Sequence, residues 1–287
     1  MNDFFDIKRF SLLAKRDIAE NRKKYLLQFL SIFGILAIVL TYNSYTYYDS
    51  MTKYAYEIDD WLSVNQGIFI IGQVLFLAFG CMSASALMDP INTKAKKISY
   101  LMNPASSFEK YFLRWVMAVV VFIALYIVAF LMADFVQWLI CTIRYPESEV
   151  RSVDYSQLIK TEYPTSRVIY QEWYLVFLAF SFYLYMQSLF ILGSTFWQKN
   201  TFIKTFSAGL VIFLLYLLVC GGLISTIFPE GMNDFGLSID SRMGDTSDED
   251  RGVSTFKGIT AGLFFFAFLN WVISYFRFRE AEVAKRI

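Results

Sequence analysis

Long apolar runs alternate with short polar segments along this chain. Six runs carry almost no charge, and each has roughly the 20 residues that a helix needs to cross about 30 Å of hydrocarbon. They predict membrane-spanning helices at approximately 25–48, 61–88, 111–140, 173–198, 204–228 and 257–277. The runs are continuously apolar and lack the alternation of a lipid-facing barrel strand. We therefore predict an all-α polytopic membrane protein whose residues 25–277 form a six-helix transmembrane domain.

An amphipathic pattern precedes the first apolar run. Residues 1–24 are polar and basic, and apolar side chains recur there at helical spacing: Phe4, Ile7, Phe10, Leu13, Ala14 and Ile18. Such a stripe with basic flanks is typical of a helix that lies in the membrane interface. A signal peptide is the competing interpretation, but the following apolar run is too long and no small-residue cleavage site follows it. We expect a cytoplasmic amphipathic helix over residues 1–24.

The distribution of charge orients the chain. With the N-terminus inside, 18 of the 26 Lys and Arg residues and 8 of the 25 acids fall in the cytoplasmic segments 1–24, 89–114, 199–204 and 277–287. The outer segments 49–60, 144–172 and 230–257 hold the other 8 basic residues and 16 acids. Excess Lys and Arg marks the cytoplasmic side of a membrane protein. Both termini are therefore predicted to be cytoplasmic, with 278–287 as a short tail and with large outer loops at 144–172 and 230–257.

The amino-acid composition excludes several classes of catalytic and metal site. The 287 residues are 56% hydrophobic and 18% charged, and the formal net charge of +1 gives no indication of nucleic-acid binding. The chain has no histidine, which removes histidine-dependent hydrolases, HExxH zinc sites and haem ligation by histidine. Its three cysteines lie in or beside apolar runs without CxxC spacing, as expected of small buried thiols. We predict no catalytic residue, no metal and no cofactor.

The polar run between the second and third spans carries a helix-start signal. Residues 89–114 hold five basic residues against two acids. Pro104 ends whatever helix precedes it, and Ser106-Ser107-Phe108-Glu109 matches a capping box, in which Ser106 and Glu109 bond each other's backbone amides. We expect a short amphipathic helix in this loop, a turn at Asn103-Pro104, and a capped helix that continues into the membrane.

Polar residues inside the spans are candidates for a translocation path, because an ionisable side chain within a membrane is expensive. Asp134 is the one acid there, with Gln137 one turn further on. It either lines such a path or is a carboxylate at the outer interface, solvated or paired with a neighbouring loop. The neutral candidates are Gln73, Gln187 and Asn270, whose other interpretation is that they bind neighbouring helices.

Small residues mark two further features of the spans. Gly80, Ser83, Ala84, Ser85 and Ala86 predict a close-packing surface at the inner end of the second span. Gly221-Gly222 predicts a kink or a break near the outer end of the fifth span.

This layout resembles the transmembrane subunit of a type-2 ABC exporter. The family has a cytoplasmic elbow helix, matched here by residues 1–24, then six helices with both ends inside, and a coupling helix between the second and third spans. Residues 93–102 correspond to the coupling helix, and Pro104 to Glu109 match the Pro-x-Ser-x-x-Glu pattern that opens the third span. The family also has a re-entrant element before its last span, and here only 221–229 could supply it, because 230–257 is acidic and polar.

The resemblance implies a function and partners. The coupling helix would bind a separate ATPase subunit through Thr93, Lys94, Lys96, Lys97, Tyr100 and Leu101. The chain itself has no GxxxxGK[ST] phosphate loop and would not be an enzyme. It would move cargo outward across a bacterial cytoplasmic membrane, paired with a second permease copy as a homodimer or heterodimer. A non-transporting membrane scaffold or sensor subunit is the main alternative, followed by a channel or secondary transporter and by a membrane enzyme.

Overall fold

The computed structural model describes residues 5–54, 61–89, 105–146, 150, 152–153, 155, 173–197, 199–227 and 246–283. Within these residues all regular structure is helical, and no strand occurs. The elements are α1 (Ile7–Tyr54), α2 (Trp61–Ser85), α4 (Ser107–Val116), the π-helical turn η2 (Met117–Val121), α5 (Phe122–Arg144), α6 (Trp173–Phe196), α7 (Thr201–Ile227) and α9 (Thr246–Val283). Six helical stretches are long and apolar enough to cross a membrane, which confirms the predicted fold class at this level.

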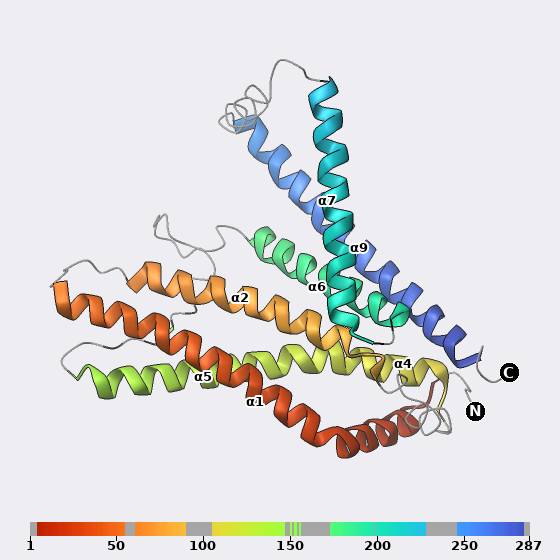
Figure 1. The fold of residues 1–287 in the computed structure, drawn as a ribbon, viewed down its shortest axis with the longest axis horizontal. Coiled ribbons are helices and arrows are strands. Elements are labelled where there is room, and N and C mark those ends of the chain that lie inside the picture. Colours follow the sequence, from red (N-terminus) through yellow and green to blue (C-terminus); the bar gives the residue numbers. More distant parts are fainter. Residues whose placement is uncertain are drawn as a thin grey trace.

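Three boundaries differ from the sequence prediction. The predicted amphipathic helix and the first span form one helix of 48 residues, because the sequence between them contains neither Gly nor Pro. Figure 1 shows that this helix bends in its N-terminal part. α9 begins at Thr246 rather than near 257. α7 stays helical through Gly221 and Gly222 to Ile227, so the predicted break there is wrong.

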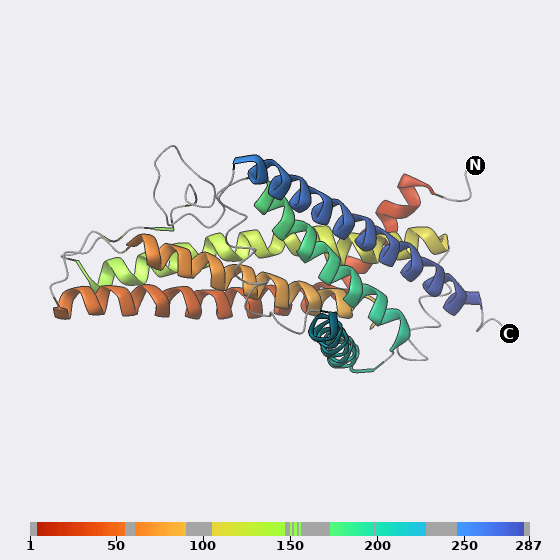
Figure 2. The same ribbon diagram turned by 90° about the horizontal axis from the view of Figure 1, so that it is seen from above.

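The helices form two groups (Figure 1). α1, α2 and α5 run alongside one another, with α4 and η2 continuing the line of α5. α6 packs mainly against α9, and the pair crosses the first group. α7 projects away from the other helices in both views (Figure 2), and none of its described side chains up to Val219 is buried.

We name the two ends of the molecule by the helix ends that lie there. The start of α1 and the end of α9 lie at the same end in Figures 1 and 2, and α4 begins there too. We call this the terminal end and the opposite end of α1, α2 and α5 the far end. The sequence prediction makes the terminal end cytoplasmic.

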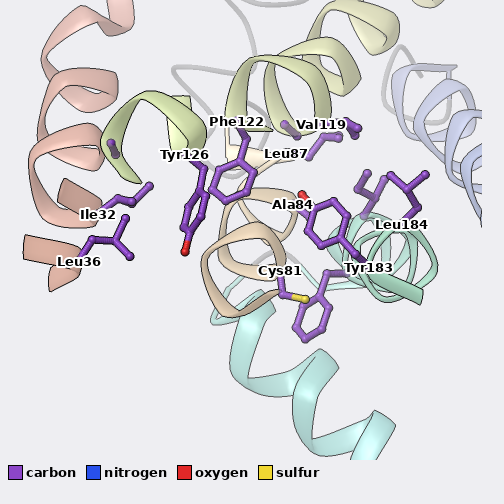
Figure 3. Packing of buried hydrophobic residues seen from close by; sticks show 14 of the residues in the cluster. Ile32, Leu36, Cys81, Ala84, Leu87, Val119, Phe122, Tyr126, Tyr183 and Leu184 are labelled. Carbon is purple, nitrogen blue, oxygen red and sulfur yellow. The ribbon is translucent and has the colours of Figure 1, made fainter. Parts of the chain in front are cut away.

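The core joins both groups of helices. Figure 3 shows Ile32 and Leu36 of α1 beside Tyr126 and Phe122 of α5, with α2 and α6 contributing to the same cluster. The small-residue surface predicted on α2 is part of this cluster, since Ala84 is fully buried. A methyl group added at Gly80 would lie 2.6 Å from the ring of Tyr183, so that only glycine fits there. The ring of Tyr183 also stacks on Phe76, with the centroids 4.2 Å apart.

Candidate functional site

Glu109 is the centre of a polar cluster at the terminal end. The structure contains the capping box predicted from the sequence: Ser106 accepts from the Glu109 amide, and Glu109 Oε2 accepts from the Ser106 amide at 2.9 Å. The second carboxylate oxygen, Oε1, accepts from the Asp6 amide at 2.8 Å and from Arg9 Nη2 at 3.2 Å. Glu109 has no exposed surface. The residue that caps α4 therefore also holds the first turn of α1 against it.

A second buried acid, Asp17, ties α1 to α4 about two turns further along. Its Oδ1 accepts from Arg114 Nη2 at 2.6 Å and from Asn21 Nδ2 at 2.9 Å. Its Oδ2 accepts from the Tyr25 hydroxyl at 2.7 Å. The side chains of Arg114 and Asp17 are only 15% and 7% exposed. A buried ion pair tolerates desolvation when further hydrogen bonds complete it, and here Asn21 and Tyr25 supply them.

Aromatic rings fill the space around these two clusters. Phe10 of α1 lies 5.7 Å from Phe112 of α4, measured between ring centroids. Trp115 of α4 stacks on Phe112 at 5.8 Å and meets Trp271 of α9 edge to face at 5.1 Å. The hydroxyl of Tyr111 on α4 donates to the Trp271 carbonyl at 2.9 Å. α4 is thus fixed between the first and the last helices of the chain.

A recess lies between the end of α2 and the start of α7. Its volume is about 360 Å³, and it is lined by Met82, Ser85, Ala86, Asp89, Asn200, Thr201, Phe202 and Ile203. Lys24 Nζ pairs with Asp89 Oδ2 at 2.7 Å, which joins α1 to the end of α2 beside this recess. The predicted ATPase-coupling residues Thr93, Lys94, Lys96, Lys97, Tyr100 and Leu101 lie outside the described residues. They follow directly on Asp89 in the chain.

Asp134 is paired with the segment that follows α5. Its Oδ1 accepts from the Val153 amide at 3.2 Å, and its Oδ2 accepts from the Tyr155 hydroxyl at 3.0 Å. Burial, and then the neighbouring carboxylate, raises the pKa of the Tyr155 phenol, so that the hydroxyl keeps its proton and donates. Of the two interpretations of Asp134, this geometry favours the carboxylate paired with a neighbouring loop.

Gln187 and Asn270 connect helices. Gln187 is fully buried, and its Nε2 donates at 2.9 Å to the carbonyl of Ala118, which belongs to the π-helical turn η2. A π turn departs from the α-helical bonding pattern and frequently occurs at functional sites. Asn270 Nδ2 of α9 donates to Ser188 Oγ of α6 at 3.0 Å. Both contacts fit the interpretation of these residues as helix-to-helix ties.

The five candidate path residues are not gathered in one place. Gln73 is exposed on α2, whereas Gln137 is fully buried on α5. Ala118, the partner of Gln187, lies 16 residues before Asp134, which is about 24 Å along a helix at 1.5 Å per residue. The role of these residues in a translocation path therefore stays a prediction, and they form at least two separate polar regions.

Sequence reasoning missed the buried acid of α1. The predicted apolar stripe included Leu13, which is buried, but also Ile7 and Ile18, which are 74% and 50% exposed, and it left out Asp17, which is buried. The signal was present, because Leu13, Asp17, Asn21 and Tyr25 follow one another at spacings of four and share one helix face. An acid at this spacing on a packed face requires a basic partner, and Arg114 supplies it.

Metal and thiol chemistry have no candidate in the described part of the chain, where no three potential ligands cluster. Cys81 and Cys141 are free and buried, as predicted. No protein-family model matches the chain, and neither does any curated protein or solved structure. Proposals about function therefore rest on the residues and contacts of the chain itself.

Proposed function

We propose that this chain is the membrane-spanning permease subunit of an ATP-driven exporter, built like the type-2 ABC exporters that its sequence resembles. A separate ATPase subunit binds the 89–110 loop on the cytoplasmic side of a bacterial membrane. Closure of that subunit on ATP pushes the loop and rocks the attached helices, which opens a path outward. The chain binds no nucleotide itself.

The observation that carries this proposal is the pair of acid-centred clusters around Glu109 and Asp17. A push on the loop reaches the bundle at Asp89 and at the capped start of α4. Asp89 is joined to α1 by Lys24, and α4 is joined to α1 by Arg9 and Arg114. Because buried, hydrogen-bonded charges resist separation, the starts of α1 and α4 are expected to move as one body. The Lys24–Asp89 pair is about half exposed and ties the end of α2 to this body more weakly. Such a body transmits a displacement instead of absorbing it.

The surface of α7 supports a second permease copy. α7 is apolar along most of its length and contacts α6 near its start, where Phe202 stacks on Phe190 at 5.2 Å and Thr205 lies against Gly193. Helices in a membrane associate through close packing of their side chains rather than by escape from water. A span that its own chain leaves this uncovered has surface for a second copy as well as for lipid.

Affinity purification from the native host in mild detergent, followed by mass spectrometry, tests the proposal. We expect a stoichiometric ATPase with a phosphate-binding loop to co-purify. Charge reversal at Lys94, Lys96 and Lys97 should then release the ATPase while the protein stays folded. The matched control reverses Lys8, Lys15 and Lys23, three exposed cations of α1 on the same predicted side.

A scaffold or sensor subunit is the second candidate, and one observation favours it. Three of the five polar residues singled out in the spans, Asp134, Gln187 and Asn270, hold helices or a loop together instead of lining a common path. A protein that purifies without any ATPase, from membranes in which it is folded, would move the assignment to this class.

A further inference from the structure

The interface between α1 and α5 changes character along its length. The two helices run in the same direction, because Asp17 meets Arg114 at the terminal end and Tyr48 packs with Cys141 near the far end. On α1 the interface residues Ile32, Leu36, Leu40, Ser44 and Tyr48 are all buried and follow at spacings of four. On α5 the corresponding buried residues are Tyr126, Ala129, Ala133, Gln137 and Cys141.

Ser44 and Gln137 face each other in this register. Each lies four residues, or about one helical turn, before the packed pair Tyr48 and Cys141. Thr41 lies three residues before Ser44 on the same side of α1. The first half of the interface is apolar, and this second half carries a hydroxyl, an amide and a second hydroxyl.

None of these polar groups has a hydrogen-bond partner among the residues that the structure describes. The amide nitrogen and oxygen of Gln137, the hydroxyl of Ser44 and the hydroxyl of Thr41 are all inaccessible and unbonded. Gln137 is the one described side chain with two such atoms. More than nine in ten buried polar groups in proteins are hydrogen-bonded, and a buried group left without a partner costs about 1–3 kcal/mol.

Other buried side chains of the same types are bonded. Ser181, Ser188 and Ser194 of α6 each donate to a carbonyl one turn back, at 2.8, 2.7 and 2.6 Å. Gln187 donates to the Ala118 carbonyl. Single unbonded atoms also occur elsewhere, for example the Ser274 hydroxyl of α9 and the Gln187 side-chain oxygen of α6. The α1–α5 interface differs because it holds four such atoms, on three side chains that lie within about one turn of one another.

We propose that Thr41, Ser44 and Gln137 form a water-binding site inside the membrane-spanning bundle, in the half of the α1–α5 interface nearer the far end. A buried water makes about three hydrogen bonds, and the four polar atoms here offer both donors and acceptors. Water at this depth gives the bundle a hydrated seam between two spans, where α1 and α5 separate at lower cost than along their apolar half. The site is independent of any ATPase.

Hydroxyl-radical footprinting of the purified chain in lipid nanodiscs tests the site, because radicals generated from bound water oxidise adjacent side chains. Two probes lie beside the site, Cys141 and Tyr48, which are 1% and 2% exposed. Their matched controls lie in the apolar core: Cys81 and Tyr126, at 5% and 6%. The controls are slightly more exposed, so access from bulk solvent would favour them.

We expect Cys141 and Tyr48 to be oxidised at least about tenfold faster than Cys81 and Tyr126. Equal rates within each matched pair would overturn the proposal. The double variant Ser44→Ala, Gln137→Leu should slow oxidation of both probes to the level of the controls. The matched variant Ser181→Ala, Gln187→Leu makes the same chemical changes on α6. It should leave the rapid oxidation of Cys141 and Tyr48 unchanged.

Rapid oxidation of Cys141 and Tyr48 in a folded Ser44→Ala, Gln137→Leu variant would also overturn the proposal, because the water would then be held by other groups. Circular dichroism and gel filtration establish that each variant is folded. If the site variant does not fold, Ser44→Ala alone replaces it. Oxidation of Cys141 and Tyr48 should again become slower in this single variant.

Discussion

α1 runs along the continuous helical stretch of α4, η2 and α5, and the two ends of this contact, which we call the α1–α5 contact, bury polar groups in opposite ways. At the terminal end, Asp17 and Glu109 each make three hydrogen bonds or more, with basic, amide and hydroxyl donors. Toward the far end, Ser44 and Gln137 make none with any described part of the chain. A completed network resists separation, whereas an uncompleted one gains hydrogen bonds when water enters. The same pair of helices is therefore locked at one end and ready to hydrate at the other.

The largest effect is expected from breaking the locked end at Arg114. Arg114→Met leaves the Asp17 carboxylate buried with no cation, which should lower the free energy of unfolding by about 3 kcal/mol. Thermal unfolding of the purified protein in detergent measures this loss. Arg16→Met is the control, because Arg16 pairs with Glu20 on the exposed face and should cost less than about 0.5 kcal/mol.

The partner substitution sharpens this first result. Adding Asp17→Leu to Arg114→Met removes the uncompensated charge and should recover part of the lost stability. A double variant that is as unstable as the sum of both single variants would show that the two side chains act separately, and the terminal end would not be the single locked body that we describe.

The capping box gives the next largest effect. Ser106→Ala together with Glu109→Ala removes the cap of α4 and the acceptor of the Asp6 amide, which should cost on the order of 1–2 kcal/mol. Arg9 reaches solvent, since its side chain is 34% exposed, and adds little to the loss. An unchanged unfolding temperature would mean that α4 does not depend on this cap.

Asp134 should give a smaller effect. Asp134→Asn keeps one carbonyl oxygen and can still accept one of the two bonds from Val153 and Tyr155. We expect a loss of about 1 kcal/mol or less, with normal expression. Tyr155→Phe removes the hydroxyl that donates to Asp134 and should give a similar loss of stability. A variant that folds normally but no longer supports export would place Asp134 in the path after all.

Hydropathy was sufficient to predict six spans, since length and apolar composition alone decide which segments can cross a bilayer. The cap at Ser106 and Glu109 was equally predictable, because its residues are only three apart in sequence. The partner of Asp17 was not, since Arg114 lies 97 residues away and only packing brings the two together. The lack of a bonding partner for Gln137 could not be predicted from the sequence either, because Gln187 lies in a similar apolar span and does have a partner.

The smallest change in stability is expected where the removed polar atoms have no bonding partner. Ser44→Ala with Gln137→Leu deletes three unbonded atoms and should alter the free energy of unfolding by less than about 1 kcal/mol, in either direction, because no protein hydrogen bond is lost. The same pair of changes at Ser181 and Gln187 removes two bonds made within the protein and should cost about 1–3 kcal/mol. Thermal unfolding of both double variants measures the difference. If the Ser44 and Gln137 variant lost 2 kcal/mol or more, those side chains would have protein partners, and the contrast between the two ends of the α1–α5 contact would fail.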